Sequence, residues 1–208
     1  MSDISKNSIR VAAICGSLRP ASYTRSALEI ALAGARELGA ETELIDLRSY
    51  QLPFCDGEDA RQAPDVLRLK REIKGAHGVL LGTPEYHAGF SGVLKNALDL
   101  MGFDEFEGKM IGLLGVAGGS MGATNSLNSL RAVGRSLRAW VLPQQVSIAQ
   151  GWKQFDNDGN LKDPQLEQRV QDMGRQVARF AYLLTSDQAM AFLQAWEEAP
   201  LNPGGEWD

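Results

Sequence analysis

The chain is poor in cysteine and histidine, the residues that most often build structural metal sites. Its 208 residues include only Cys15, Cys55, His77 and His87, which are scattered along the sequence. A structural zinc site needs about four such ligands at close spacing, so the sequence excludes one. So few cysteines also exclude a disulfide framework, and we expect reduced thiols in a cytoplasmic protein.

An excess of positive charge is missing as well. The sequence has 21 lysines and arginines but 26 aspartates and glutamates, which gives a net charge of −5. Proteins that bind nucleic-acid backbones carry concentrated positive charge, so no nucleic-acid partner is expected.

Long hydrophobic runs are also scarce. The first eight residues are polar, and the apolar run after them is too short for a secretion signal. The stretch 110–130 is uncharged and long enough to cross a membrane, but Gly, Ser, Thr and Asn fill its second half. A strand followed by a glycine-rich turn explains this stretch better, so no membrane partner is expected.

What the sequence does contain is an alternation of short apolar runs and segments of helical periodicity. Each predicted strand is followed by a predicted helix, and Pro143 places an edge or a bulge in the last strand. We expect residues 1–186 to form one domain and 187–208 a tail, with a short helix over 190–196 and a flexible end. The predicted strands span 10–15, 41–47, 78–83, 109–117 and 140–148, and loops are expected over 84–90 and 151–160.

This alternation predicts an α/β fold, a three-layer αβα sandwich around a five-stranded parallel sheet. Ligands of such sheets bind at the carboxyl ends of the strands, so the loops that follow the strands are the candidate sites. In the flavodoxin-like strand order 2-1-3-4-5, the loops after the first, third and fourth strands meet in one crevice.

The loop after the first strand has the composition of an anion site. It begins at Gly16 and leads into a helix, whose first N–H groups favour negative charge. Ser17, Ser22 and Thr24 can donate neutral hydrogen bonds, and Arg19 can add a charge-assisted bond to a phosphate. The alternative is a capping turn, in which the hydroxyl groups satisfy the free N–H groups of the helix.

The loop after the third strand has the composition of a site for a planar ring. Pro84 shapes it, and Tyr86 offers a flat surface. Glu85 has the chemistry of a general acid or base, or it caps the next helix. His87 is a candidate proton carrier, or it forms a loop hydrogen bond.

The loop after the fourth strand is rich in glycine. Gly118, Gly119 and Ser120 are followed by a third glycine, Gly122. Glycines allow a ligand to approach the backbone closely and permit positive φ angles. Alone this cluster carries little weight, but three such loops on one sheet edge predict a ligand site.

The motifs Gly16-Ser-Leu-Arg-x-x-Ser, Pro84-Glu-Tyr-His and Gly92-Val-Leu-Lys-Asn-Ala-Leu-Asp, in this order, resemble those of the NADPH-dependent FMN reductase family. The resemblance covers about residues 9–185 and implies a flavodoxin-like fold with bound FMN. It implies a phosphate site at Ser17, Arg19, Ser22 and Thr24, an isoalloxazine border at Pro84, Glu85, Tyr86 and His87, and a pyrimidine border at Gly118, Gly119 and Ser120. His87 stands where asparagine is usual in that family.

The resemblance further implies that hydride passes from NADPH or NADH through FMN to a small acceptor, which is a quinone, a free flavin, an azo compound or a metal ion. The flavin carries this chemistry, so no side chain is predicted to be catalytic. Two alternatives stay open. One is a flavodoxin-like electron carrier that docks on protein partners, and the other is a scaffold that has lost its cofactor.

The resemblance also implies a homodimer or homotetramer, joined partly through the helix predicted over 92–101. An exposed stripe of Leu94, Leu98 and Met101 would need a partner to cover it. The alternative is that this helix is buried within the monomer.

Overall fold

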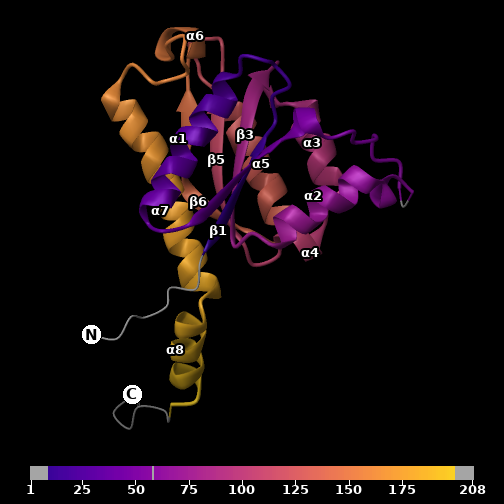
Figure 1. The fold of residues 1–208 in the computed structure, drawn as a ribbon, viewed down its shortest axis with the longest axis vertical. Helices are drawn as coiled ribbons and strands as arrows, with labels where there is room; N and C mark the ends of the chain where they lie inside the picture. The colour runs from indigo at the N-terminus through magenta and orange to yellow at the C-terminus, as the bar shows by residue number, and fades with distance from the viewer. Residues whose placement is uncertain (1–8, 58, 200–208) are drawn as a thin grey trace, which may run out of the picture.

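The computed structural model describes residues 9–57 and 59–199 (Figure 1). Five parallel strands form one sheet in the order β2-β1-β3-β5-β6, which confirms the predicted flavodoxin-like topology. A further strand of two residues, β4 (Gly89–Phe90), pairs antiparallel with the end of β3. The parallel strands are β1 (Arg10–Cys15), β2 (Glu41–Asp46), β3 (Gly78–Tyr86), β5 (Met110–Val116) and β6 (Trp140–Ile148).

Helices cover both faces of the sheet, as the predicted three-layer sandwich requires (Figure 1). On one face lie α1 (Tyr23–Glu37) and α7 (Pro164–Thr185). On the other lie α2 (Pro64–Lys74), α3 (Gly92–Asp99), α4 (Phe103–Phe106) and α5 (Thr124–Ser136). The remaining elements are the 3₁₀ turns Leu47–Ser49 and Ala60–Gln62 and the helices α6 (Gly151–Gln154) and α8 (Asp187–Glu197).

Strand composition and small residues explain this packing. All seven residues of β5 are buried, as expected of a strand covered on both faces. Two glycines let α1 and α7 approach closely. A Cβ atom on Gly174 would lie 1.7 Å from the Ala31 carbonyl oxygen, and one on Gly34 would lie 2.1 Å from that of Gln171. Larger side chains at these positions would force the two helices apart.

The apolar stripe of α3 is buried within the chain itself. Leu94 is 0% exposed, Leu98 2% and Met101 3%, and all three pack in the core beneath that face of the sheet. The prediction of an exposed stripe is therefore wrong, because α3 lies against the sheet and its neighbours cover its apolar face. The stripe gives no support for an oligomer.

The last strand has the predicted irregularity at Pro143. Ile111 pairs with Val141 and Leu113 pairs with Gln145, so three residues of β6 oppose one of β5 between these pairs. β6 is also an edge of the sheet. Pro143 lacks an N–H group and fits only such a position.

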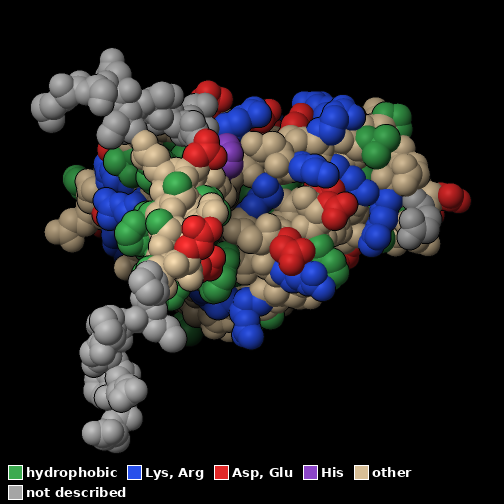
Figure 2. Space-filling view, turned by 90° about the horizontal axis from the view of Figure 1, so that it is seen from below, with side chains coloured by type: hydrophobic (Ala, Val, Ile, Leu, Met, Phe, Trp, Pro, Cys, Tyr) green, Lys and Arg blue, Asp and Glu red, His purple; other side chains and the backbone are tan. Residues whose placement is uncertain are grey.

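The tail forms the predicted short helix, α8, which extends beyond the lower end of the molecule (Figure 1). Figure 2 views this end from below. The predicted flexible end, 200–208, and the polar start, 1–8, lie outside the described residues. No helix in the described part is long and apolar enough to cross a membrane.

Candidate functional site

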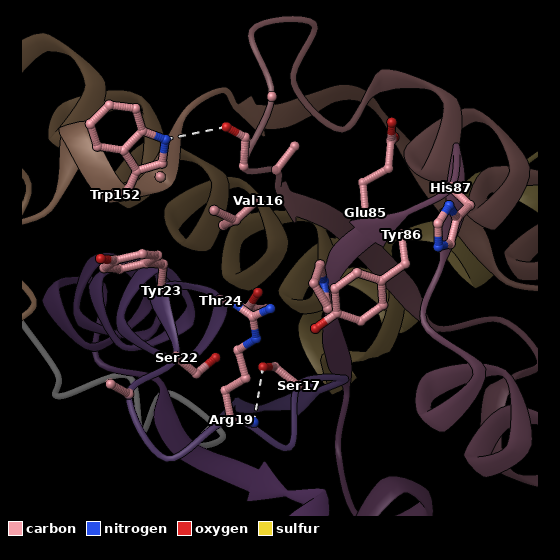
Figure 3. Close-up of a pocket in the computed structure, with 16 residues that line it drawn as sticks. Ser17, Arg19, Ser22, Tyr23, Thr24, Glu85, Tyr86, His87, Val116 and Trp152 are labelled. Carbon is pink, nitrogen blue, oxygen red and sulfur yellow. Dashed lines mark hydrogen bonds between the residues drawn. The ribbon is translucent and has the colours of Figure 1, made fainter.

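A cleft of about 440 Å³ lies at the carboxyl ends of the strands (Figure 3). Its size is within the range of small-molecule sites, roughly 300–1,000 Å³. Every predicted site residue except Ser120 lines it, so the loops after β1, β3 and β5 do converge. Six further residues line the cleft that were not predicted from the sequence. They are Ala21, Tyr23, Val116, Ala117, Gly151 and Trp152.

The loop between β1 and α1 combines a helix cap with free backbone N–H groups. Ser22 is the N-cap of α1, and its hydroxyl accepts a hydrogen bond from the Arg25 N–H at 3.3 Å. The capping interpretation is therefore correct for Ser22. No acceptor for the N–H groups of Tyr23 and Thr24 is found among the described residues, so both are free to bind an anion. We call residues 16–24 the phosphate loop.

Arg25 braces the outer side of the phosphate loop. Its Nη1 donates to the Pro20 carbonyl at 2.9 Å, and its Nη2 donates to the Arg19 carbonyl at 3.1 Å. Its Nε donates to Asp46 at 2.9 Å, at the end of β2. Because these carbonyl groups are bonded to Arg25, the loop is held in the conformation that leaves its N–H groups free.

Asp46 holds the Arg25 side chain in position. Burial would raise the pKa of its carboxyl group, but hydrogen bonds from Arg48, together with the charges of Arg25 and Arg48, outweigh burial and hold the pKa below its usual value. The carboxylate is therefore ionised at neutral pH and keeps Arg25 in place.

Buried hydrogen bonds join the phosphate loop to β3, which lies beside β1 in the sheet. The Ser91 hydroxyl donates to the Gly16 carbonyl at 2.6 Å, and the Ser91 N–H donates to the Thr83 hydroxyl at 3.0 Å. The Gly16 N–H donates to the Gly82 carbonyl at 2.8 Å. A Cβ atom on Gly16 would lie 2.8 Å from the Cβ of Leu94, so only glycine fits there.

Arg19 is the exposed cation of the phosphate loop. Its side chain rises into the cleft between Thr24 and Tyr86 (Figure 3), and its guanidinium carbon lies 6.0 Å from the centre of the Tyr86 ring. Ser17, Ser22 and Thr24 are nearly buried around its base. The positively charged side chain of Arg19 thus lies next to the buried hydroxyl groups of the same loop.

The segment expected to be a loop after β3 is a hairpin. Tyr86 pairs with Gly89 in β4, and His87 and Ala88 form the turn with φ angles of 50° and 63°. Such positive values at both central residues define a tight hairpin turn, in which asparagine and histidine are better tolerated than most residues. The backbone therefore explains why His87 can replace the asparagine usual in the resembling family.

Glu85 is engaged in capping. Its Oε2 accepts a hydrogen bond from the Ser126 N–H at 3.0 Å, in the first turn of α5, and its carboxylate points away from the phosphate loop (Figure 3). Glu85 therefore caps a helix, as the alternative interpretation has it, but the helix is α5 and not the next one in the sequence. The next helix, α3, is capped by Ser91.

Backbone bonds join the loops after β5 and β6 at the other end of the cleft. The N–H groups of Gly151 and Gln150 donate to the carbonyls of Ala117 and Gly119, each at 3.0 Å. Trp152 Nε1 donates to the Gly118 carbonyl at 3.3 Å. A Cβ atom on Gly118 or Gly119 would meet nothing within 4 Å, so both glycines border open space, and only Gly122 in this loop has a positive φ, 70°.

Tyr23 and Trp152 are the aromatic residues that the sequence analysis missed. Tyr23 stacks on Phe155 with ring centres 5.2 Å apart, and Trp152 is 58% exposed at the cleft. The available signal was the pair Gly151-Trp152, which begins three residues after the end of a predicted strand. The sequence predicts a loop at this pair, whereas in the structure the pair begins the short helix α6.

Residues 9–153 match the family model described as NADPH-dependent FMN reductase. The chain belongs to this family. It is 30% identical to the NADPH-dependent FMN reductase ArsH of Shigella flexneri over 181 residues, which are 85% of this chain and 70% of that protein. It is 46% identical to the NADPH azoreductase of Bacillus sp. (strain OY1-2) over 109 residues, which are 52% of this chain and 61% of the azoreductase, less than two thirds of its length.

A solved structure also has this fold. The structure of a flavodoxin from the domain Archaea aligns with a TM-score of 0.61 at 13% identity, covering 83% of this chain and 99% of that one. At this identity the likeness shows the fold alone. Family membership confirms the prediction of an oxidoreductase that uses NADPH or NADH with FMN as its flavin, and the family description names NADPH.

Proposed function

We propose that this FMN reductase holds FMN in the cleft and passes reducing equivalents from NADPH to a small planar acceptor. The observation that supports it best is the phosphate loop, where free N–H groups, buried hydroxyls and Arg19 meet. Neutral donors around one flexible cation suit a phosphate monoester at the mouth of a helix. These features favour a bound cofactor over a scaffold that has lost its cofactor.

When bound, FMN supplies the redox chemistry, because a flavin accepts hydride from a nicotinamide and returns electrons to an acceptor. Ser17, Arg19, Ser22 and Thr24 would hold its phosphate. The hairpin residues Pro84 to His87 and the backbone of Gly118 and Gly119 would border its ring. Glu85 accepts a hydrogen bond from the first turn of α5, and the proposal assigns it no proton transfer.

The open mouth of the cleft supports a planar acceptor. Tyr86 is 45% exposed and Trp152 58% exposed, and both line the cleft. Flat aromatic surfaces favour stacking with aromatic ligands. An azo compound, a quinone or a free flavin fits this chemistry better than a bare metal ion does, and the name of the Bacillus relative supports the azo compound.

A cytoplasmic location and a homo-oligomeric state belong to the same proposal. Cys15 and Cys55 are both free thiols, as expected of a reducing compartment. An oligomer would need a surface other than the buried stripe of α3.

The test is reconstitution followed by an acceptor panel. The purified chain should be yellow or become so with FMN, and should oxidise NADPH with a quinone, an azo dye or free FMN, with NADH as the comparison. A colourless protein that gains no flavin absorbance contradicts the proposal. Flavin binding without turnover on any acceptor favours the flavodoxin-like carrier instead.

A further inference from the structure

The C-terminal helix α8 is the least buried element of the described chain. None of its residues is buried, and Phe192 is 74% exposed and Trp196 68% exposed. Ala189, Phe192, Leu193 and Trp196 follow the i, i+3, i+4, i+7 spacing, so they lie on one face of the helix. Within the described chain, Phe192 and Trp196 on this face are largely uncovered.

The contacts that hold α8 lie at its start. The Ser186 hydroxyl accepts a hydrogen bond from the Ala189 N–H at 3.2 Å, and the Tyr182 hydroxyl bonds Gln188. A helix of this length is marginal in water by itself, since isolated helices shorter than about 12–15 residues are barely stable. An exposed apolar face of this kind marks an interaction surface.

The segment that contains α8 carries the net charge of the protein. After Arg179 the sequence has no lysine, arginine or histidine and has five acidic residues, among them Glu197 and Glu198 beside Trp196. The net charge of the whole chain is −5, so residues 1–179 are balanced. An aromatic residue with two neighbouring carboxylates is thus presented at the end of α8.

A complementary surface lies where α5 leads into β6. A hollow of about 400 Å³ is lined by Arg131, Arg135, Arg138, Ala139, Trp140 and Val141. We call it the arginine hollow. Trp140 is 62% exposed. Arg131 is bonded to backbone carbonyls and Arg138 to Glu107, whereas Arg135 has no acidic partner within the described residues.

Both surfaces lie at the amino ends of the strands, away from the cleft. Trp140 is the first residue of β6, and α7 reaches the first residue of β3 through Val177 and Ala181 before it leads into α8. Figure 1 shows α8 below the sheet and α6, beside the cleft, at the top.

We infer that α8 docks in the arginine hollow of a second copy of this chain. Trp196 would pack against the partner's Trp140, and Glu197 and Glu198 would face the partner's Arg135 and Arg138. In a twofold dimer of this kind each α8 would enter the hollow of the other copy, so the two contacts would form together. The cleft stays open at the opposite end.

Charge reversal on each surface tests this inference on the full-length chain. The variant Glu197→Lys/Glu198→Lys should have half the native mass of the wild type in sedimentation at micromolar concentration, and so should Arg135→Glu/Arg138→Glu. Like charges facing each other should weaken association roughly hundredfold or more. An equal mixture of the two variants should regain the wild-type mass, because reversed α8 then meets a reversed hollow.

Two controls keep the result specific. Glu29→Lys/Glu43→Lys makes the same charge change on α1 and β2, where both side chains are exposed, and should leave the mass unchanged. FMN binding by all variants should match the wild type, which shows that they are folded. A monomeric wild type, charge variants that keep the wild-type mass, or a mixture that stays at half mass would each overturn the inference.

Discussion

The two ends of the cleft are built in different ways. The phosphate loop is braced by side chains, through Arg25 on Asp46 and Ser91 on Gly16, and its serines are buried. The ring end, formed by the hairpin, Gly118, Gly119 and α6, is joined by backbone hydrogen bonds and leaves Tyr86 and Trp152 exposed. The first end is therefore braced on several sides, and the second is open to solvent.

This difference assigns the tasks of the enzyme to separate places. A cofactor that stays bound through many turnovers needs a preorganised anchor, because ordering a loop at each binding event costs affinity. A nicotinamide and an acceptor that alternate need an open surface. Substitutions at the two ends should therefore have different consequences.

The largest expected effect is on stability. Gly16→Val should lower the free energy of unfolding by about 3 kcal/mol, since its side chain would be forced against Leu94 and Ser91. Gly118→Val is the matched control and should change it by less than about 0.5 kcal/mol, because nothing lies near. Urea unfolding of the FMN-free proteins measures both. Equal losses would show that the two ends are equally tight.

Flavin affinity comes next. Arg19→Ala should weaken FMN binding roughly ten- to hundredfold, because a charge-assisted hydrogen bond contributes about 1.5–3 kcal/mol. Riboflavin lacks the phosphate, so its affinity should change little. Trp152→Ala, at the ring end, should weaken both flavins by the same factor. Titration of both flavins at fixed salt decides, and a matching shift for the two in Arg19→Ala would rule out the phosphate role.

A smaller effect is expected from the anchor of the brace. The pKa of Asp46 is lowered in the folded chain, so its ionised form stabilises the fold above the usual aspartate pKa, and this contribution is lost as the pH falls through the lowered value. Asp46→Asn should cost about 1 kcal/mol at pH 7. The difference from the wild type should shrink below about pH 4. A difference that stays constant down to pH 2 would contradict the ionised anchor.

The smallest effect is expected at Glu85. Glu85→Gln should keep turnover within tenfold of the wild type, well below the ~10²–10⁴-fold loss of a general acid or base. The Gln carbonyl can still accept the bond from the Ser126 N–H. Steady-state NADPH oxidation at full FMN occupancy is the measurement. A larger fall would reveal a proton-transfer role at the ring end.

The same difference explains how much could be predicted from the sequence. Ser17, Arg19, Ser22 and Thr24 lie within eight consecutive residues at a helix start, so local rules of capping and anion binding find them. The parallel sheet likewise follows from the alternation of strands and helices, and its strand order is what the resemblance to the family implies. Local order is what sequence patterns describe.

The ring end is assembled from segments far apart in the chain. Trp152 reaches Gly118 only because β5 and β6 are neighbours. Glu85 caps α5 and not α3, which is the next helix after Glu85 in the sequence. The stripe of Leu94 was misjudged for the same reason, since periodicity shows an apolar face and not what covers it. These features depend on tertiary contacts that no short motif encodes.

Pro143 has a consequence for how the molecule behaves at high concentration. A free sheet edge invites strands from other molecules, which is the first step toward aggregation. At the β6 edge Pro143 offers no N–H group, and the register shift around it bends the ladder. At the opposite edge, β2 presents the exposed charges of Glu41 and Glu43. Neither edge provides a smooth template, so fibril growth has no straight strand from which to begin.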